Sequence, residues 1–267
     1  MRIVVCAKEV LDPDAVNNYA LAGRLTIGDD GRTITQSAIP RLMNAYDEQA
    51  IEAALRIRDS GMECTIAVAS VGDDPSAILK HAAALGADEI VHTKVADGET
   101  DCAGVAAVLA AYIRASGGAD LVLCGRQASD DDQGVVPALL GERLGAPVIT
   151  VARDVTLAGA AVRVTRVTPD GDEVVEADLP AVVTISNELG APRYPTGARS
   201  MQARRMQPTI VTLADLGLAE GKLAPRVVLE RLFAPSVQGN CEFINGASPA
   251  ESARTLIVRL REERLLV

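Results

Sequence analysis

The chain has 267 residues, with 26 lysines and arginines against 36 aspartates and glutamates, and therefore a formal net charge of −10. Nucleic-acid binders need a basic face, and single-strand binders also need aromatic platforms; with an acidic balance and only 2% aromatic residues, both classes are excluded. Hydrophobic residues make up 48% of the chain, which excludes a disordered protein, and no apolar run reaches the roughly 20 residues of a membrane span.

Strands and helices are predicted to alternate over the first 150 residues. Residues 3–7 are a continuous apolar run, typical of a strand buried on both faces, and residues 25–35 predict a hairpin. Helices are then predicted at 44–58, 75–85, 101–115 and 133–144, and strands at 64–70, 89–92, 121–123 and 148–151. Strands separated by helices of this length indicate βαβ units, so we expect an α/β fold with a doubly wound, mostly parallel sheet.

The pattern changes after residue 152. Runs at 154–158, 161–168 and 173–177 alternate with turns and predict an antiparallel meander that extends one edge of the sheet, while 181–185 is again a buried strand. The following segment is rich in proline and has little periodicity until an amphipathic helix predicted at 249–264. We therefore divide the chain into a domain of residues 1–190 and a C-terminal arm of residues 191–267, which must lie on this domain or on a partner chain.

Cysteine and histidine usage indicates neither a metal centre nor a catalytic group. The five cysteines include no CxxC pair, and their odd number argues against a disulfide framework. With His81 and His92 as the only histidines, an HExxH site is impossible, and no GxSxG elbow occurs. The first residues enter a strand directly, without the pattern of a signal peptide, so we expect a cytoplasmic protein of bacterial type.

The most informative segment is Gly125 to Gly134, GRQASDDDQG, which follows a buried strand and runs into a helix. Ligands of doubly wound sheets bind beyond the carboxyl ends of the strands, and a helix N-terminus offers free N–H groups to a phosphate. The three aspartates at 130–132 would repel a phosphate, so at least two must point away, cap the helix or pair with Arg126. Because neither GxGxxG nor GxxxxGK[ST] occurs, a plain helix cap in an acidic loop and a nucleotide site both stay open, with the plain cap favoured.

Six segments occur in the order in which a known family has them. They read IVVCAK from residue 3, NAYDEQAIEAAL from 44, GAD from 86, GRQASDDD from 125, LPAVVT from 179 and PRYP from 192. Together they resemble the β-subunit of electron transfer flavoproteins, over essentially the whole chain. The resemblance implies a Rossmann-like fold of the adenine nucleotide α-hydrolase kind, and an electron-carrier subunit rather than an enzyme. It also implies a heterodimer, in which the C-terminal arm embraces an α-subunit that holds most of a redox FAD.

The resemblance also implies which residues bind a cofactor, position by position. They are Cys6, Ala7, Asn44, Ala45, Tyr46, Asp47, Val71, Gly125, Arg126, Gln127, Asp130, Asp132, Gln133, Gly134, Val135 and Val136, with Tyr46 near the redox flavin. The implied nucleotide is a structural AMP, and the alternative is the second FAD of electron-bifurcating members that oxidise NADH. Asp131 and Gln133 stand where those members have glycine and threonine, and the added bulk and charge favour AMP.

The implied electron donors are flavin dehydrogenases of fatty acid or acyl-CoA oxidation, and the implied acceptor is a membrane quinone reductase. Gly197 and Ala198 stand where the family carries a Leu-Pro pair that anchors the acyl-CoA dehydrogenase, so the usual anchor is missing. The alternative of another class is an ATP-using enzyme of the adenine nucleotide α-hydrolase type. Such an enzyme would need a glycine-rich phosphate loop after the first strand, whereas residues 9–14 are acidic and lack glycine.

Overall fold

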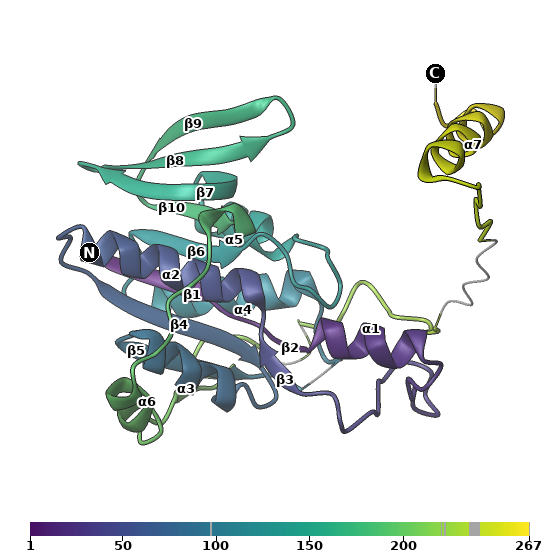
Figure 1. Ribbon diagram of the computed structural model, residues 1–267. Coiled ribbons are helices and arrows are strands. Elements are labelled where there is room, and N and C mark those ends of the chain that lie inside the picture. The colour runs from purple at the N-terminus through teal and green to yellow at the C-terminus, as the bar shows by residue number, and fades with distance from the viewer. Residues whose placement is uncertain (97, 220, 222, 235–240, 267) are drawn as a thin grey trace. The chain divides into compact units, whose positions relative to one another are not determined.

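The computed structural model describes residues 1–96, 98–219, 221, 223–234 and 241–266 (Figure 1). The chain divides into two compact units, Met1–Leu232 and Phe233–Val267. The first unit contains the sheet, and the second contains helix α7 (Pro249–Glu262), which confirms the predicted final helix. None of the helices in the described ranges is long and apolar enough to cross a membrane.

The first unit is built on a sheet that has nine strands among the described residues, in the order β11-β5-β4-β1-β6-β10-β7-β8-β9. The strands are β1 (Arg2–Cys6), β4 (Thr65–Gly72), β5 (Glu89–Lys94), β6 (Leu121–Gly125), β7 (Val148–Ala158), β8 (Ala161–Thr168), β9 (Gly171–Asp178), β10 (Ala181–Ile185) and β11 (Thr209–Val211). From β11 to β7 all neighbours are parallel, and β8 and β9 continue the sheet as antiparallel strands at one edge, where Figure 1 shows them. The predicted mostly parallel sheet with an edge meander is therefore confirmed.

Helices cover both faces of this sheet, as a doubly wound fold requires. They are α2 (Ala45–Asp59), α3 (Ser76–Leu85), α4 (Cys102–Ala115) and α5 (Val136–Leu144). Alternate residues of β1 divide between the two faces: Ile3 and Val5 pack in one core with α2 and α3, and Val4 and Cys6 pack in another with α4 and α5. All four side chains are buried, so β1 lies in the middle of the molecule.

Two predicted elements have different bounds. The helix expected over 133–144 begins only at Val136, because Asp132 and Gly134 adopt positive φ angles of 52° and 61°, which an α-helix does not contain. The strands expected at 148–151 and 154–158 form the single strand β7, because a bulge beside Val151, whose φ is 61°, bends the chain without ending the ladder.

Several short elements were not predicted. The strands β2 (Glu9–Leu11) and β3 (Arg41–Met43) pair with each other, and helix α1 (Pro13–Leu21) follows β2. The hairpin expected at 25–35 is reduced to a single bridge between Ile27 and Ile34. No residue of α1 is buried, so it lacks the apolar stripe that makes a helix visible in a sequence.

The proline-rich segment after β10 lies on the first unit as far as Leu232. It contains the 3-10 turn η1 (Asn187–Leu189), the helix α6 (Gly197–Ala203) and strand β11, which pairs with β5. Further along, Leu223 is buried against Val95 and Val108. Among the described residues of the tail, Ala203 and Leu223 are thus buried against this chain's own elements, and the second unit begins at Phe233.

Asp101 attaches this tail to helix α4. Its Oδ1 accepts hydrogen bonds from the N–H groups of Ala103 at 2.9 Å and Gly104 at 3.1 Å, which caps the helix. Its Oδ2 accepts from the N–H groups of Arg226 at 2.7 Å and Val227 at 3.3 Å. One carboxylate therefore caps α4 and also binds the backbone of the tail at residues 226 and 227.

Replacing Asp101 with alanine is expected to lower the free energy of unfolding by about 2 kcal/mol, because the cap and the tail contact are lost together. Urea unfolding measures the loss. The control is Asp14→Ala in α1, where no residue is buried and a change within about 0.5 kcal/mol is expected. Equal effects of the two changes would show that neither the cap nor the tail contact of Asp101 stabilises the fold.

Candidate functional site

The candidate site lies at the carboxyl ends of the central strands. β1 has β4 on one side and β6 on the other, and the chain leaves this point in opposite directions, which makes it the topological switch point of the sheet. The register aligns Cys6 of β1 with Ala69 of β4 and with Cys124 of β6. The structure therefore brings together three of the segments that the sequence analysis singled out: 6–7, 71 and the start of 125–134.

The first turn of α2 lies directly below these strand ends. Asn44 is the N-cap of α2, but its side chain does not cap the helix. Instead, its Nδ2 donates to the carbonyl of Gln127 at 2.8 Å, and its Oδ1 accepts from the N–H of Ser129 at 3.3 Å. Buried Asn44 thus holds the loop that follows β6.

Asp47 is buried one turn further along the same helix. Its Oδ2 accepts from the N–H of Lys8 at 2.8 Å, and its Oδ1 accepts from the N–H of Gly125 at 2.9 Å. A Cβ at position 125 would lie 2.3 Å from that Oδ1 and 2.7 Å from the Cβ of Tyr46, so only glycine fits here. Helix α2 therefore packs so closely against the end of β6 that no side chain fits at position 125.

The negative charge of the acidic loop is partly offset by a lysine from the end of β1, which was not predicted from the sequence. The Nζ of Lys8 lies 2.7 Å from Asp130 Oδ1 and 3.4 Å from Asp131 Oδ2. Burial alone would lower the pKa of Lys8, but the two carboxylates raise it above its usual value. Asp132 accepts instead from Gln127 Nε2 at 2.7 Å. The aspartates therefore do not pair with Arg126, which was one of the expected arrangements. The position of Lys8 directly after the first strand could have indicated this pairing from the sequence.

Arg126 points to the other side of the loop. Its guanidinium carbon lies 5.0 Å from the ring centroid of half-buried Tyr46, and its Nη1 donates to Ser186 Oγ at 3.1 Å. Its Nε is buried without a hydrogen-bond partner among the described residues. A buried guanidinium nitrogen without an acceptor is a feature that an anionic ligand could complete.

The remaining residues of the expected site lie on the loop and at the start of α5. Gln133 accepts from Cys102 Sγ at 3.3 Å, and Gly134 has a φ of 61° with no room for a Cβ, which would lie 2.8 Å from the Arg126 carbonyl. Val135 is the N-cap of α5 and makes no side-chain cap, so the helix offers uncapped N–H groups. Ala45 is exposed in the first turn of α2.

A cavity of about 430 Å³ opens beside this loop. It is lined by Arg126, Gln127, Asp132, Gln133, Gly134, Pro137, Ala138, Thr150, Val151 and Thr184. The uncapped start of α5 and the Arg126 cation favour an anion, and Asp132 in the wall is already engaged by Gln127. The residues present therefore fit a ligand that carries a phosphate group.

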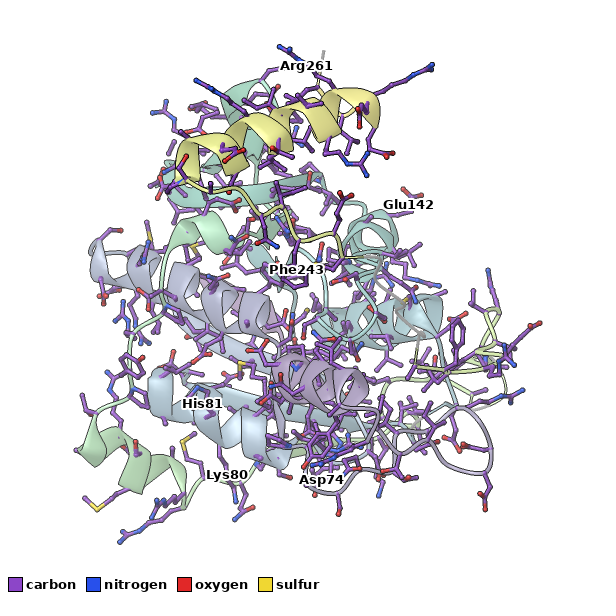
Figure 2. All side chains as sticks on the ribbon, turned by 45° about the vertical axis from the view of Figure 1, so that its right-hand side comes forward. Asp74, Lys80, His81, Glu142, Phe243 and Arg261 are labelled. Atoms are coloured by element: carbon purple, nitrogen blue, oxygen red, sulfur yellow. The ribbon has the colours of Figure 1, made fainter. Side chains whose placement is uncertain are left out.

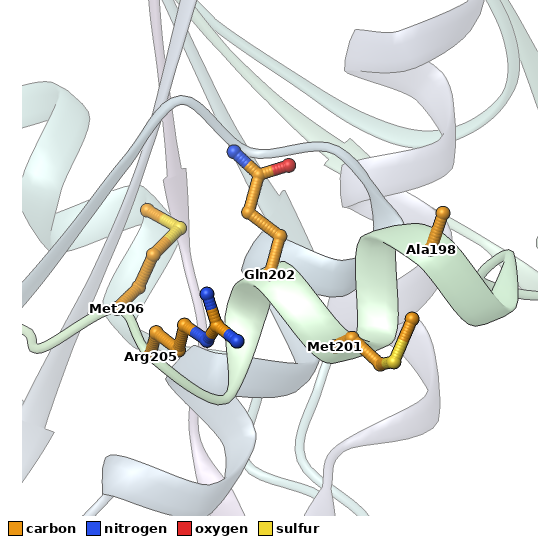
Figure 3. A pocket seen from close by; sticks show the side chains of 5 residues that line it. All are labelled: Ala198, Met201, Gln202, Arg205 and Met206. Atoms are coloured by element: carbon orange, nitrogen blue, oxygen red, sulfur yellow. The ribbon is translucent and has the colours of Figure 1, made fainter.

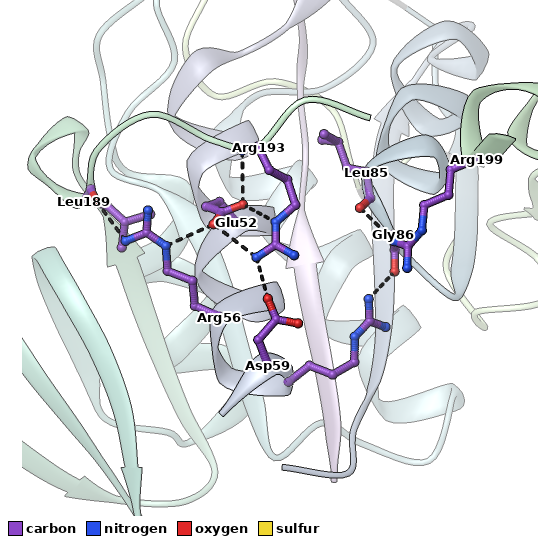
Figure 4. Close-up of polar contacts among 9 residues, drawn as sticks. Glu52, Arg56, Asp59, Leu85, Gly86, Leu189, Arg193 and Arg199 are labelled. Atoms are coloured by element: carbon purple, nitrogen blue, oxygen red, sulfur yellow. Dashed lines mark hydrogen bonds and ion pairs between the residues drawn. The ribbon is translucent and has the colours of Figure 1, made fainter. Parts of the chain in front are cut away.

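A second surface follows β10, where a buried carboxylate holds the chain to α2. Glu52, 7% exposed, accepts from Arg193 Nε at 2.7 Å and from Arg56 Nε at 3.0 Å (Figure 4). Burial alone would raise the pKa of Glu52, but the two guanidinium groups lower it below its usual value. Arg193 also donates to Asp59 at 2.7 Å, and the neighbouring Tyr194 is 94% exposed. The network thus fixes a segment that presents an aromatic side chain to the outside.

Helix α6 (Gly197–Ala203) contains the two positions at which the resemblance implies a missing anchor. It borders a shallow cavity of about 420 Å³ lined by Ala198, Met201, Gln202, Arg205 and Met206 (Figure 3). Ala198 thus lies at the edge of a hollow that is lined by two methionines.

The fold and its switch point define an α/β protein of the doubly wound class. The family model of the electron transfer flavoprotein domain matches residues 32–216. The caffeyl-CoA reductase–Etf complex subunit CarD of Acetobacterium woodii is 34% identical over 271 residues, covering 100% of both chains. The electron transfer flavoprotein β-subunit of Mycobacterium tuberculosis is 32% identical over 81% of this chain and 80% of its own length, and that of Sus scrofa is 29% identical over 98% and 97%. The chain belongs to the electron transfer flavoprotein family and is of the β-subunit type.

Proposed function

We propose that this chain is the β-subunit of a heterodimeric electron transfer flavoprotein, a carrier that moves electrons through an FAD held mainly by the α-subunit. The observation that carries the proposal is the full-length match to such subunits, combined with a crevice that lies where this fold binds nucleotides. In this reading the chain has no catalytic residue of its own. Tyr46 and Arg126, stacked at the mouth of the crevice, form its wall toward the flavin.

We propose that the crevice takes an AMP. The apolar strand ends at Cys6, Ala7 and Val71 suit an adenine ring, and the loop of 125–136 offers N–H groups to the phosphate. The loop carries three carboxylates, of which Lys8 neutralises two in part, so a single phosphate group meets less repulsion than a pyrophosphate. In this proposal AMP is a structural ligand: it occupies the crevice, orders the loop and takes no part in the redox step.

A second FAD in place of AMP is the alternative, in a complex that oxidises NADH and splits its electrons. The cavity of about 430 Å³ on the β7 side of the loop favours this alternative, because it offers room beyond the phosphate position. The full-length relative that is named for a caffeyl-CoA reductase complex is compatible with either cofactor.

The segment after β1 argues against the alternative, an ATP-using enzyme. After β1 the chain continues through Lys8 into the strand β2, without a glycine-rich turn that could enclose a triphosphate. Lys8 is already held by Asp130 and Asp131. The electron-carrier proposal therefore has the stronger support.

The proposed partner is the α-subunit, embraced by an arm of residues 191–267. Phe243, labelled in Figure 2, is 81% exposed, and Leu256, Ile257 and Val258 of α7 are 46%, 44% and 52% exposed. Apolar side chains gathered on one short unit are typical of a surface that a second chain covers. We further propose flavin dehydrogenases as donors, a membrane quinone reductase as an acceptor, and a cytoplasmic location.

Co-expression with the α-subunit of the same organism tests this proposal. The two chains are expected to co-purify as a yellow one-to-one heterodimer whose flavin is reduced by a flavin dehydrogenase. Produced alone, this chain is expected to aggregate, because the apolar surface of the second unit stays uncovered. A monodisperse monomer with a melting temperature unchanged by the α-subunit would contradict the proposal.

A further inference from the structure

Both oxygens of the Asp47 carboxylate accept hydrogen bonds from the backbone, and the Asn44 side chain also stabilises the ionised form. The side chain is 6% exposed, and each of its oxygens accepts one N–H, from Lys8 at 2.8 Å and from Gly125 at 2.9 Å. Among the contacts that the structure describes, both oxygens of Asp47 bind N–H groups of the backbone, and neither is left for a ligand in the crevice. Its geometry therefore differs from that of a residue that binds a nucleotide directly.

The two N–H groups belong to opposite walls of the switch point. Lys8 follows the end of β1, and Gly125 is the last residue of β6. Beyond them, Lys8 holds the acidic loop through Asp130, and Gly125 begins the loop itself. One side chain on α2 thus connects the two strand ends between which the proposed nucleotide lies.

We infer that Asp47 is a positioning residue: its ionised carboxylate sets the spacing between the ends of β1 and β6, and thereby the shape of the nucleotide crevice. The inference rests on the proposed function for the identity of the ligand. Asn44 assists from the same helix turn, since it holds the loop at Gln127 and Ser129. The carboxylate must be ionised to hold both N–H groups strongly, because the hydroxyl oxygen of a protonated carboxyl is a much weaker acceptor.

The surroundings of Asp47 bring its protonation close to neutral pH. Burial raises its pKa to about 7, against the hydrogen bonds that favour the ionised form. The groups facing it are the Lys8 ammonium beyond β1 and the Cys124 thiol of β6, which hydrogen-bonds the Cys6 thiol of β1. On its own helix, the neighbouring Glu48 lies 2.8 Å from His81 of α3, labelled in Figure 2.

Protonation of Asp47 changes both the affinity for the nucleotide and the stability of the fold. Below a pH of about 7 the carboxyl is protonated and one N–H keeps only a weak acceptor, so we expect the crevice to loosen and nucleotide affinity to fall as the pH falls. Stability changes in the opposite direction. A folded-state pKa raised above the ordinary 3.8 means that the folded chain binds the proton more tightly, so this group's contribution to stability rises as the pH falls from about 7 to about 4.

The test measures binding of AMP to the heterodimer by equilibrium dialysis at about pH 8 and about pH 6, either side of that pKa. The variants are Asp47→Asn and, as a matched control on the same helix turn, Glu48→Gln. Because the AMP phosphate itself titrates near pH 6, the readout is the difference between each variant's profile and that of the wild type. Asp47→Asn is expected to bind AMP about tenfold more weakly at pH 8 and to lose most of the extra pH dependence, whereas Glu48→Gln follows the wild type.

A second measurement does not depend on the ligand. Hydrogen exchange of the Gly125 amide, without nucleotide, is expected to be faster in Asp47→Asn, and in the wild type faster at about pH 6 than the intrinsic exchange rate alone explains. If the Gly125 amide is unaffected by the substitution, or if AMP binding is the same in wild type and Asp47→Asn, the inference is overturned. If the amide responds but the wild type binds no AMP at either pH, Asp47 positions the strand ends as inferred and the proposed nucleotide is wrong.

Discussion

Replacing Gly125 with alanine is expected to remove the bound nucleotide and to lower the free energy of unfolding by about 3 kcal/mol. The added Cβ would lie 2.3 Å from Asp47 Oδ1, 2.7 Å from Tyr46 Cβ and 3.0 Å from the Asp47 nitrogen. The last two atoms belong to the first turn of a helix whose inner side is buried, so they cannot move aside cheaply. Either the β6 terminus or α2 must shift, and the shift breaks the hydrogen bond between Gly125 and Asp47.

The comparison is with Gly72→Ala, at the end of the neighbouring strand β4. A Cβ at position 72 meets nothing within 4 Å, so this variant is expected to keep its nucleotide and its stability within about 0.5 kcal/mol. Urea unfolding and nucleotide content of the purified heterodimer measure both variants. A Gly125→Ala protein with normal nucleotide content would show that the close approach of α2 to β6 does not shape the crevice.

Replacing Glu52 with leucine is expected to lower the free energy of unfolding by about 3 kcal/mol at neutral pH. Glu52 is 7% exposed, and its removal leaves Arg193 and Arg56 without their shared partner. Because Arg193 is 35% exposed and keeps access to water, the loss stays at the lower end of the range for broken buried pairs. The segment that carries Tyr194 is expected to detach from α2, which proteolysis near residue 194 would report.

This effect has a defined pH dependence. The pKa of Glu52 is lowered in the folded chain, so its contribution is present above its ordinary value of 4.5 and is lost as the pH falls through the folded-state value. The difference between wild type and Glu52→Leu is therefore expected to shrink in acid. The control is Asp59→Asn, which removes only the outer, 56%-exposed carboxylate and should cost less than about 1 kcal/mol. Equal losses for the two variants would contradict the central role of Glu52.

The fold was largely predictable because its signals are local. The runs around β1, β4, β6 and β10 are continuous and apolar, and each becomes a strand buried on both faces. What the sequence could not show is where β10 enters the sheet. It pairs with β6 and β7, although the whole meander separates it from β7 in the chain. Strand order depends on packing between distant segments, which periodicity does not report.

The sequence indicated which segments form the candidate site, but not which side chains contact one another there. The loop after β6 and the start of α2 were both singled out, and the structure brings them together through Asn44. The sequence left three arrangements open for the acidic triplet and did not include Lys8, which pairs with two of the aspartates from far away in the chain. The helix start was misplaced for a related reason: the left-handed backbone of Asp132 and Gly134 leaves no trace in an apolar pattern.

We propose that this chain holds one adenine nucleotide at the strand ends joined by Asp47, beside a single redox flavin that belongs mainly to its partner. The direct measurement is extraction of the purified heterodimer, followed by chromatographic quantification of its flavin and adenine nucleotides per pair of chains. We expect one FAD and one AMP per heterodimer. Two FAD and no AMP, together with direct reduction by NADH and delivery of electrons to both a high-potential and a low-potential acceptor, would contradict it.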